Sequence, residues 1–374
     1  MERQVLSPKK ITVIDPVGIK AGMDLYDINL CLALKKTGTN VILCSNFKNI
    51  QLKSFEVFNI SSKTKIAKIK NIVFGHLKAF YFSKKHKTKS IVLHSFSFEL
   101  KDLFVMVMAK IFVLRIILVL HDVSGFASKD NRYIRVLILK YLVNRIVVHN
   151  KFSQQILFKS SKEIIKKKTV IIKHGSFTEN SFTKYSKKEA LSQLRLNKNF
   201  KYILFFGQIK KVKGLDILLN AVALTKRADL KLIIAGKPWE DSFRKYDKLI
   251  KKLDISDKLV RYVEYISSGK RDLLFSACEF IILPYKKIYQ SGVLLMTMSN
   301  KIPVIASDLE PFKEIIDINN GILFKKNDPK DLADKIDFAL KNNDLLKQYA
   351  KNAYFLMESE FSWDKIAKQY NKFL

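Results

Sequence analysis

Short, β-branched apolar runs alternate with longer amphipathic segments along nearly the whole chain of 374 residues. Near-continuous apolar strands that alternate with helices are typical of parallel sheets covered by helices on both faces. Six strands are expected in the first half of the sequence, at 11–15, 41–44, 91–94, 116–121, 146–149 and 170–173. Five more are expected at 202–206, 230–235, 259–263, 280–284 and 304–306. The pattern therefore predicts an α/β protein with two doubly wound parallel sheets.

A polar stretch at 178–201 separates the two series of strands. We expect a first Rossmann-like domain over residues 1–190 and a second over 191–357, because the chain is too long for one ordinary core. Residues 358–374 are expected to form a C-terminal helix that packs back on the first domain, with Ser362 as its N-cap. Sheets of this kind bind ligands at the carboxyl ends of their strands, so a ligand is expected in a cleft between the two domains.

Several classes of protein are excluded by the composition. The three cysteines (Cys31, Cys44 and Cys278) are far apart and lack metal-ligand spacing, which argues against zinc fingers and disulfide scaffolds and suits the cytoplasm. The sequence has neither a Walker A pattern nor a G-x-G-x-x-G fingerprint after its first strand. No cluster of His, Asp and Glu has metal spacing, so we expect no protein-bound metal and no tightly bound cofactor.

A second set of patterns concerns membranes. The apolar stretch 103–120 is interrupted by Lys110 and Arg115, so it is interpreted as a buried helix followed by a buried strand. The N-terminus lacks the apolar core of a signal peptide. We therefore expect a cytoplasmic protein without a membrane-spanning helix.

The positive charge is concentrated in the first half of the chain. Residues 1–200 contain 37 Lys and Arg against 12 Asp and Glu, whereas residues 201–374 contain 31 against 22. Residues 61–90 contain nine Lys and no acidic residue, interleaved with Ile and Phe at partly helical spacing. This pattern predicts a basic amphipathic helix on an anionic membrane surface, with contacts from Lys63, Lys65, Lys68 and Lys70. The alternative is a core-packed helix with a solvated Lys face. Nucleic acid is not an expected partner, because no nucleic-acid-binding module is recognisable.

Four segments together resemble a GT-B glycosyltransferase of the family 4 (group 1) type. They are ITVIDPVGIKAGM at 11–23, FFGQIKKVKGLDILLNAV at 205–222, LKLIIAGKPW at 230–239 and ILPYKKIYQSGVLLMTMSNKIPVIASD at 282–308. Their order and spacing follow the family across almost the whole chain. The resemblance implies the GT-B fold, with a nucleotide diphosphate sugar bound by the second domain and the acceptor facing the first.

The resemblance also implies a set of donor-binding residues. Lys213 and Gly214 match the family's Lys-Gly pair, which holds the donor phosphates; Gln208 replaces the usual Arg, and Lys210 is its expected substitute. Lys211 is expected to be solvated. The start of a helix near residue 290 can bind phosphate through free backbone N–H groups. The expected donor-binding residues are Gly22, Gly207, Lys210, Lys213, Gly214, Gly236, Gln290, Ser291, Gly292 and Val293.

Two features concern the chemistry. The family usually has a pair of Glu separated by seven residues, and these positions are Ile288 and Met296 in this chain. The usual ribose contact therefore does not carry over, and retention or inversion at the sugar stays open. His121 ends a strand where the family has a His that touches the donor sugar, and Asp122 is the candidate general base.

Other histidines lie in similar positions. His149 and His174 also end strands, and His174-Gly175 resembles the family's cleft loop. His94 is expected to be structural.

These observations predict a hexosyltransferase that acts as a peripheral protein at the inner face of the plasma membrane. Its expected acceptor is a lipid-linked or growing cell-surface glycan of the capsule, O-antigen or exopolysaccharide type. Two alternatives are a nucleotide-sugar epimerase on the same fold and a non-catalytic partner protein, the latter motivated by the missing Glu pair.

Overall fold

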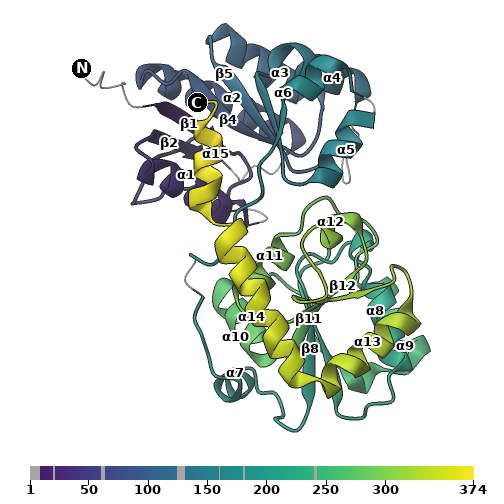
Figure 1. The fold of residues 1–374 in the computed structure, drawn as a ribbon. Coiled ribbons are helices and arrows are strands. Elements are labelled where there is room, and N and C mark those ends of the chain that lie inside the picture. Colours follow the sequence, from purple (N-terminus) through teal and green to yellow (C-terminus); the bar gives the residue numbers. More distant parts are fainter. Residues whose placement is uncertain are drawn as a thin grey trace. The chain divides into compact units, whose positions relative to one another are not determined.

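The computed structural model describes residues 9–19, 22–59, 64–123, 131–159, 161–179, 182–239 and 242–374 (Figure 1). The chain forms two compact units, one of Met1–Gly175 with Phe361–Leu374 and one of Ser176–Glu360. The first border falls earlier than the expected residue 190, because α7 (Lys187–Gln193) packs against α10 (Ser268–Ala277) of the second unit. The last residues, Phe361–Leu374, belong to the first unit.

A seven-stranded parallel sheet in the order β3-β2-β1-β4-β5-β6-β7 forms the first unit. Its strands are β1 (Lys10–Ile14), β2 (Asn40–Ser45), β3 (Lys53–Glu56), β4 (Ser90–Ser95), β5 (Arg115–Leu120), β6 (Arg145–Val148) and β7 (Thr169–Ile171). Six of these are the expected strands. The edge strand β3 was not expected, because its sequence KSFE contains no apolar run and its side chains are at most half-buried.

Helices cover both faces of this sheet. They are α1 (Met23–Lys36), α2 (Lys65–Lys85), α3 (Leu100–Ile111), α4 (Arg132–Leu137) with the π-helical turn η2 (Ile138–Leu142), α5 (Lys151–Lys159), α6 (Glu163–Lys168) and α15 (Trp363–Asn371). Ile11 and Val13 of β1 lie in a core cluster with residues of α1 and α15. Thr12 points to the opposite face, where it accepts a hydrogen bond of 3.0 Å from Ser83 of α2.

The long apolar stretch at 103–120 is divided between α3 and β5, as expected. Val105, Met106 and Ala109 of α3 are buried, and β5 is buried from Ile116 onward. Among the described residues, no helix is both long enough and apolar enough to span a membrane.

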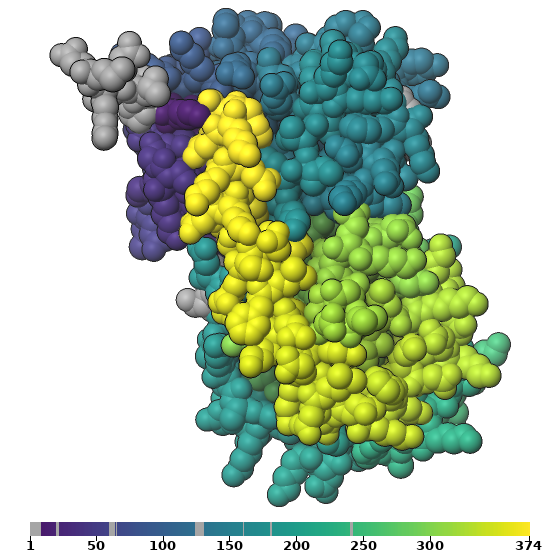
Figure 2. All heavy atoms as spheres, viewed as in Figure 1, coloured from purple at the N-terminus to yellow at the C-terminus, as the bar shows by residue number. Residues whose placement is uncertain are grey.

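The C-terminal helix α15 closes the core of the first unit. It packs against α1, and Trp363 and Tyr370 are completely buried. In Figure 2 the last residues (yellow) lie directly against the purple residues near the start of the chain. A Cβ atom on Gly175 would lie 2.1 Å from Trp363 Cε2, so only glycine fits beside this ring. Ser362 occupies the N-cap position, but its side chain makes no capping hydrogen bond, so the expected cap is wrong in that respect.

The second unit contains a six-stranded parallel sheet in the order β10-β9-β8-β11-β12-β13. Its strands are β8 (Lys201–Phe206), β9 (Leu230–Ala235), β10 (Leu259–Tyr262), β11 (Phe280–Leu283), β12 (Val304–Ser307) and β13 (Ile322–Phe324). Its other helices are the short turns η3 (Lys211–Lys213) and η4 (Ser256–Lys258), and α8 (Leu215–Leu224), α9 (Arg244–Leu253), α11 (Gly292–Ser299), α12 (Glu310–Lys313), α13 (Pro329–Lys341) and α14 (Asn343–Glu360). All five expected strands are present, and β13 is additional. The predicted arrangement of two helix-covered parallel sheets is confirmed.

Candidate functional site

Each sheet has one point at which the strand order reverses. In the second unit, β8 lies between β9 and β11, so the loops that follow β8 and β11 leave in different directions. Crevices at such switch points, at the carboxyl ends of the strands, are where doubly wound sheets bind their ligands. In the first unit, the corresponding point lies between β1 and β4.

Three of the predicted glycines allow close backbone packing at this edge of the second unit. Gly207 directly follows β8 and Gly236 directly follows β9, with φ angles of 106° and 153°. A Cβ on Gly236 would lie 1.9 Å from the Gly207 carbonyl oxygen, and one on Gly214 would lie 1.8 Å from the Pro284 carbonyl oxygen. These glycines are thus required by the packing of the loops, independently of any ligand.

Two of the predicted lysines lie over aromatic rings in the same region. Lys213 Nζ is 3.7 Å from the centre of the Tyr285 ring, and Lys210 Nζ is 4.3 Å from the centre of the Trp239 ring. A cation over an aromatic face is attracted by the ring's quadrupole, which restrains the side chain. Lys211 is exposed, as expected, whereas Lys213 is half-buried.

The start of α11 lies beside the end of β8. Ser291 is the N-cap, and its Oγ accepts a hydrogen bond of 3.2 Å from the Leu294 N–H. A Cβ on Gly207 would lie 3.4 Å from Val293 Cγ2, whereas one on Gly292 would meet no atom within 4 Å. The first N–H groups of a helix have no partner inside it and carry a partial positive charge. The space in front of Gly292 therefore suits an anion.

The remaining predicted positions of this loop are also described. Gln290 is half-buried beside the cap, and the apolar side chains of Ile288 and Met296 are half-buried where the family has its Glu pair. The structure thus brings together nine predicted donor-binding residues of the second unit at one edge of its sheet. They are Gly207, Lys210, Lys213, Gly214, Gly236, Gln290, Ser291, Gly292 and Val293.

A row of polar side chains ends the apolar layer of the first unit. On the face covered by α1, the buried residues Val13, Val92, Val119, Val147 and Ile172 lie two positions before Asp15, His94, His121, His149 and His174. Because side chains alternate along a strand, residues two positions apart lie on the same face, so these polar residues lie on the face covered by α1. The strands that they follow, β1, β4, β5, β6 and β7, are neighbours in that order. The row therefore crosses five adjacent strands at their carboxyl ends.

One tyrosine of α1 covers the four imidazoles. The Tyr26 ring lies edge-on to His94, His121, His149 and His174, with centroid distances of 5.2, 5.6, 5.9 and 4.8 Å. Trp363 packs against Tyr26 at 5.1 Å. The C-terminal helix, which belongs to the same unit, thus helps to cover the histidine row.

The hydrogen bonds divide the four histidines into two pairs. His149 Nδ1 lies 2.9 Å from the Ile172 carbonyl oxygen and His174 Nδ1 lies 2.7 Å from the Gly175 carbonyl oxygen, so both rings donate to the backbone. His94 Nδ1 instead lies 2.9 Å from His121 Nε2. His94, which was expected to be structural, is therefore in direct contact with the predicted site residue His121.

Asp122 and Gly22 lie at the same edge of the first unit. Asp122 directly follows His121 and is half-buried, and Gly22 is the left-handed N-cap of α1, with φ of 74°. Of the four lysines predicted to contact a membrane, Lys68 and Lys70 are exposed on α2. Lys63 lies outside the described residues, and the side chain of Lys65 is not among those described. Within the described part of the chain, no group of three or more His, Cys, Asp and Glu could hold a metal ion.

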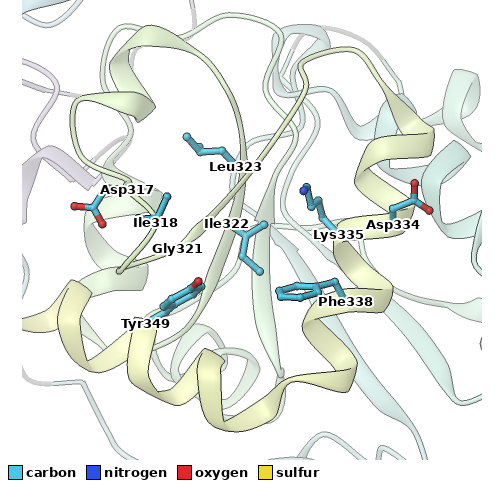
Figure 3. A pocket seen from close by; sticks show the side chains of 9 residues that line it. All are labelled: Asp317, Ile318, Gly321, Ile322, Leu323, Asp334, Lys335, Phe338 and Tyr349. Carbon is cyan, nitrogen blue, oxygen red and sulfur yellow. The ribbon is translucent and has the colours of Figure 1, made fainter.

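A separate cavity of about 420 Å³ lies between α13, α14 and the start of β13 (Figure 3). Phe338 and Tyr349 line it from the two helices, and Gly321 and Ile322 line it from the amino end of β13. None of the predicted site residues lines this cavity. It therefore belongs to the opposite end of the strands from the donor-binding edge.

Sequence reasoning missed several residues of both regions. Tyr285 and Trp239 lie under the lysines, and their role depends on contacts that no local pattern shows. Asp27 of α1 was detectable, because it is an acidic residue in the buried helical stripe formed by Met23, Leu30 and Leu34.

The buried histidines make the first unit sensitive to acid. Burial lowers the pKa of His149 to about 3 and the pKa values of His174 and His76 to about 4, and it lowers those of His94 and His121 as well. Since these values lie below the unfolded value of about 6.5, protons bind preferentially to the unfolded chain. Each excluded proton costs about 1.4 kcal/mol of stability per pH unit below 6.5. Burial also raises the pKa values of Asp27 and Asp102 in this unit. Their effect on stability has the opposite sign, but two carboxyl groups offset only part of the effect of the five histidines.

We therefore predict that the first unit loses stability between pH 6.5 and pH 4 before the second unit, which contains no histidine. Hydrogen exchange at pH 7 and pH 5, corrected for the chemical exchange rate, measures this difference. Strands β4, β5 and β6 should lose protection, while β8 and β9 keep theirs. Equal loss in both units would contradict the assignment of these histidines as buried neutral groups.

The similarity to a known family model at the level of sequence lies within the second unit. Residues 186–355 match the family model of glycosyl transferases group 1. An uncharacterized glycosyltransferase of Methanocaldococcus jannaschii is 31% identical over 173 residues, which cover 45% of this chain and 46% of that protein. A GDP-mannose:glycolipid 4-beta-D-mannosyltransferase of Xanthomonas campestris pv. campestris is 33% identical over 105 residues, 28% of this chain and 29% of that protein. The matches thus span less than half the length of these relatives.

The similarity of fold extends over nearly the whole chain. The structure of HepE of Anabaena, in complex with UDP and glucose, aligns with a TM-score of 0.77 and 17% identity over 97% of this chain and 98% of that protein. Two helix-covered parallel sheets, with the polar carboxyl ends described above, are the architecture that the four sequence segments imply. The chain therefore has the GT-B fold, and residues 186–355, within its second unit, match the glycosyl transferases group 1 model.

Proposed function

We propose that the protein is a glycosyltransferase that transfers a hexosyl group from a nucleotide diphosphate sugar. The observation that carries the proposal is that Lys213, held over the Tyr285 ring, and the start of α11 both lie at the carboxyl edge of the sheet that matches the family model. A lysine and a helix N-terminus together suit a diphosphate. The complex of HepE with UDP and glucose supports a donor of this class.

The same groups supply the main catalytic effect. When the bond between the anomeric carbon and the diphosphate oxygen breaks, negative charge develops on the nucleoside diphosphate, while the sugar bonds to an acceptor oxygen that releases its proton. Donors that are fixed in advance near this charge stabilise the transition state. Lys213 is held over Tyr285, and the α11 amides are fixed by the helix, so neither has to reorganise. Because Ile288 and Met296 are apolar, other groups must bind the ribose.

An assay with and without acceptor tests this function. The full chain is incubated with nucleotide diphosphate sugars and with lipid-linked saccharides, and the products are identified by mass spectrometry. We expect the acceptor to gain one sugar and no change in the donor sugar when the acceptor is left out. Conversion of the sugar without an acceptor would instead show an epimerase. Neither binding nor turnover with any donor would show a non-catalytic partner protein.

We further propose that the first unit binds an anionic membrane surface, where its acceptor would be a lipid-linked or growing cell-surface glycan. One face of α2 packs inward through Ala79, Phe80 and Ser83, which are completely buried. Elsewhere on α2, Ile66 and Phe74 are 70% and 59% exposed. The helix therefore combines core packing with apolar side chains that are mostly exposed.

Neighbouring helices extend this exposed apolar surface. α3 packs against α2 and η2, and Leu100 and Ile111 at its two ends are 74% and 65% exposed. Exposed lysines accompany these apolar side chains on α2: Lys68, Lys70, Lys78, Lys84 and Lys85. Basic and apolar residues on one set of helices are typical of surfaces that lie in the membrane interface. The Xanthomonas relative, named as a glycolipid mannosyltransferase, supports an acceptor of the lipid-linked class.

The phosphate contact of Lys213 is testable by substitution. We predict that Lys213→Ala weakens binding of the nucleotide sugar by roughly 1.5–3 kcal/mol, the range for a hydrogen bond to a charged group. Lys211→Ala is the matched control, because Lys211 lies in the same short helix but is exposed. Titration calorimetry measures both. Equal affinities of the two variants would remove Lys213 from the donor site.

Membrane binding is testable with vesicles. We predict that the protein binds vesicles containing anionic lipid more tightly than neutral ones, and that salt weakens this binding as the Debye length falls from ~10 Å at 0.1 M to ~3 Å at 1 M. Changing Lys68 and Lys70 to Glu should reduce the binding, since each lysine contributes on the order of 1 kcal/mol. Changing Lys330 and Lys341, exposed on α13 of the second unit, is the control. Equal responses to the two double substitutions would contradict this membrane surface.

A further inference from the structure

We propose that Tyr285, Lys286 and Asp216 are positioning residues. They join the loop that carries Lys213 to the loop between β11 and α11, so that the two phosphate-binding elements of the second unit form one preformed site. The proposal rests on the proposed function for the identity of the ligand, a nucleoside diphosphate. The contacts that join the loops belong to the second unit itself and are measurable without any ligand.

The two loops lie against each other through their backbones. The Lys286 N–H donates a hydrogen bond of 2.8 Å to the carbonyl oxygen of Val212, which belongs to the short helix η3 that ends at Lys213. Gly214 follows directly, with φ of 67°, and a Cβ there would lie 1.8 Å from the Pro284 carbonyl oxygen. The loop that carries Lys213 is therefore in direct backbone contact with the loop that precedes α11.

An ion pair joins the same two loops. Lys286 Nζ lies 2.6 Å from Asp216 Oδ2, and the two side chains are 30% and 40% exposed. An isolated pair at this exposure contributes little to stability. Here, however, the backbone N–H and the ammonium group of Lys286 bind the same short segment, residues 212–216. Two contacts from one residue fix the orientation of the loops as well as their separation.

Tyr285 provides the surface on which the Lys213 side chain lies. It is completely buried, and its carbonyl oxygen accepts a hydrogen bond of 2.7 Å from Ser307 Oγ at the end of β12. Its ring packs against Phe312 of α12 at a centroid distance of 5.4 Å. The Lys213 ammonium group, 3.7 Å from the centre of the Tyr285 ring, is therefore restrained by a ring that two further elements of the second unit fix.

This arrangement lowers the cost of binding a phosphate group. A flexible side chain loses rotamer freedom when a ligand immobilises it, which is equivalent to about two- to tenfold in affinity. Lys213 has lost much of this freedom before a ligand arrives, because the ring beneath it and the turn η3 restrain it. Lys286 acts through Lys213, since the charge of Lys286 is already matched by Asp216.

Carbon NMR of the unliganded full chain, with lysine labelled with ¹³C at Cε, tests the position of Lys213 directly. Protons held over an aromatic face are shifted upfield. We therefore expect the Cε protons of Lys213, assigned from Lys213→Arg, to lie upfield of those of the exposed Lys211.

Two kinds of variant test the origin of this shift. Tyr285→Leu should abolish it, whereas Tyr285→Phe should keep it, because the aromatic ring remains. The double substitution Asp216→Ala with Lys286→Met removes the ion pair without changing the net charge, and it should reduce the shift. An unshifted Lys213 signal in the wild type, or a shift of full size in Tyr285→Leu or in the double variant, would overturn the proposal.

Titration calorimetry with UDP, GDP and ADP tests the consequence for donor binding. We expect the double variant of Asp216 and Lys286 to bind about two- to tenfold more weakly than the wild type, the cost of immobilising one side chain. In a chain that also carries Lys213→Ala, the same double substitution should have no further effect, because the pair acts through Lys213. A direct contact of Lys286 with phosphate would instead add its effect to that of Lys213→Ala, and such additivity would overturn the positioning role.

Arg227 and Asp229 provide a matched control. Arg227 Nη2 lies 2.7 Å from Asp229 Oδ2, the side chains are 27% and 39% exposed, and Asp229 directly precedes β9, at the opposite end of that strand from Gly236. Arg227→Met with Asp229→Ala should leave both the Lys213 signal and the affinity unchanged. Equal losses from the two double variants would overturn the proposal. Absence of binding of any nucleoside diphosphate by the wild type would contradict the proposed function, and the Lys213 signal alone would then decide the positioning role.

Discussion

The parallel direction of the strands in each sheet is the constraint on which the candidate sites depend. All strands of a parallel sheet end at one edge, so the side chains that follow their apolar runs collect there. In the first unit these are Asp15 and the four histidines after Val92, Val119, Val147 and Ile172, and in the second they are glycines, lysines and the start of α11. In both units the polar residues thus follow directly after the buried apolar layer of the sheet. The residue types at this edge differ between the two units.

The histidine row requires a substantial apolar and aromatic cover. Buried imidazoles stay neutral only if water is excluded, and Tyr26 and Trp363 lie over the rings that face α1. Trp363 comes from the last helix of the chain, nearly 190 residues after Gly175, whose missing side chain makes room for it. The packing of α15 on the first unit is therefore linked to the protonation of the row, and through it to the state of His121.

The fold was largely predictable because its strands are continuous apolar runs. All eleven expected strands are present. The two missed ones are edge strands: β3 contains no apolar run, and β13 is only three residues long. The expected cap at Ser362 failed, since a residue type that favours the N-cap does not fix the rotamer that forms the bond. Within the site, resemblance located Lys213 and the start of α11, but the Tyr285 ring beneath Lys213 arises from a tertiary contact across 72 residues. The contact between His94 and His121 was likewise hidden, because strands 27 residues apart become neighbours only in the sheet.

We propose above that a nucleoside diphosphate binds at the carboxyl edge of the second sheet. Hydrogen exchange of the full chain, with and without added nucleoside diphosphates, tests this most directly, since bound phosphate oxygens protect the amides that donate to them. We predict new protection in the first turn of α11, at Gly292 and Val293, and in the loop that carries Lys213. Protection confined to Gly321 and Ile322, beside the cavity at the opposite end of the strands, or no protection in the second unit with any nucleotide, would contradict the account.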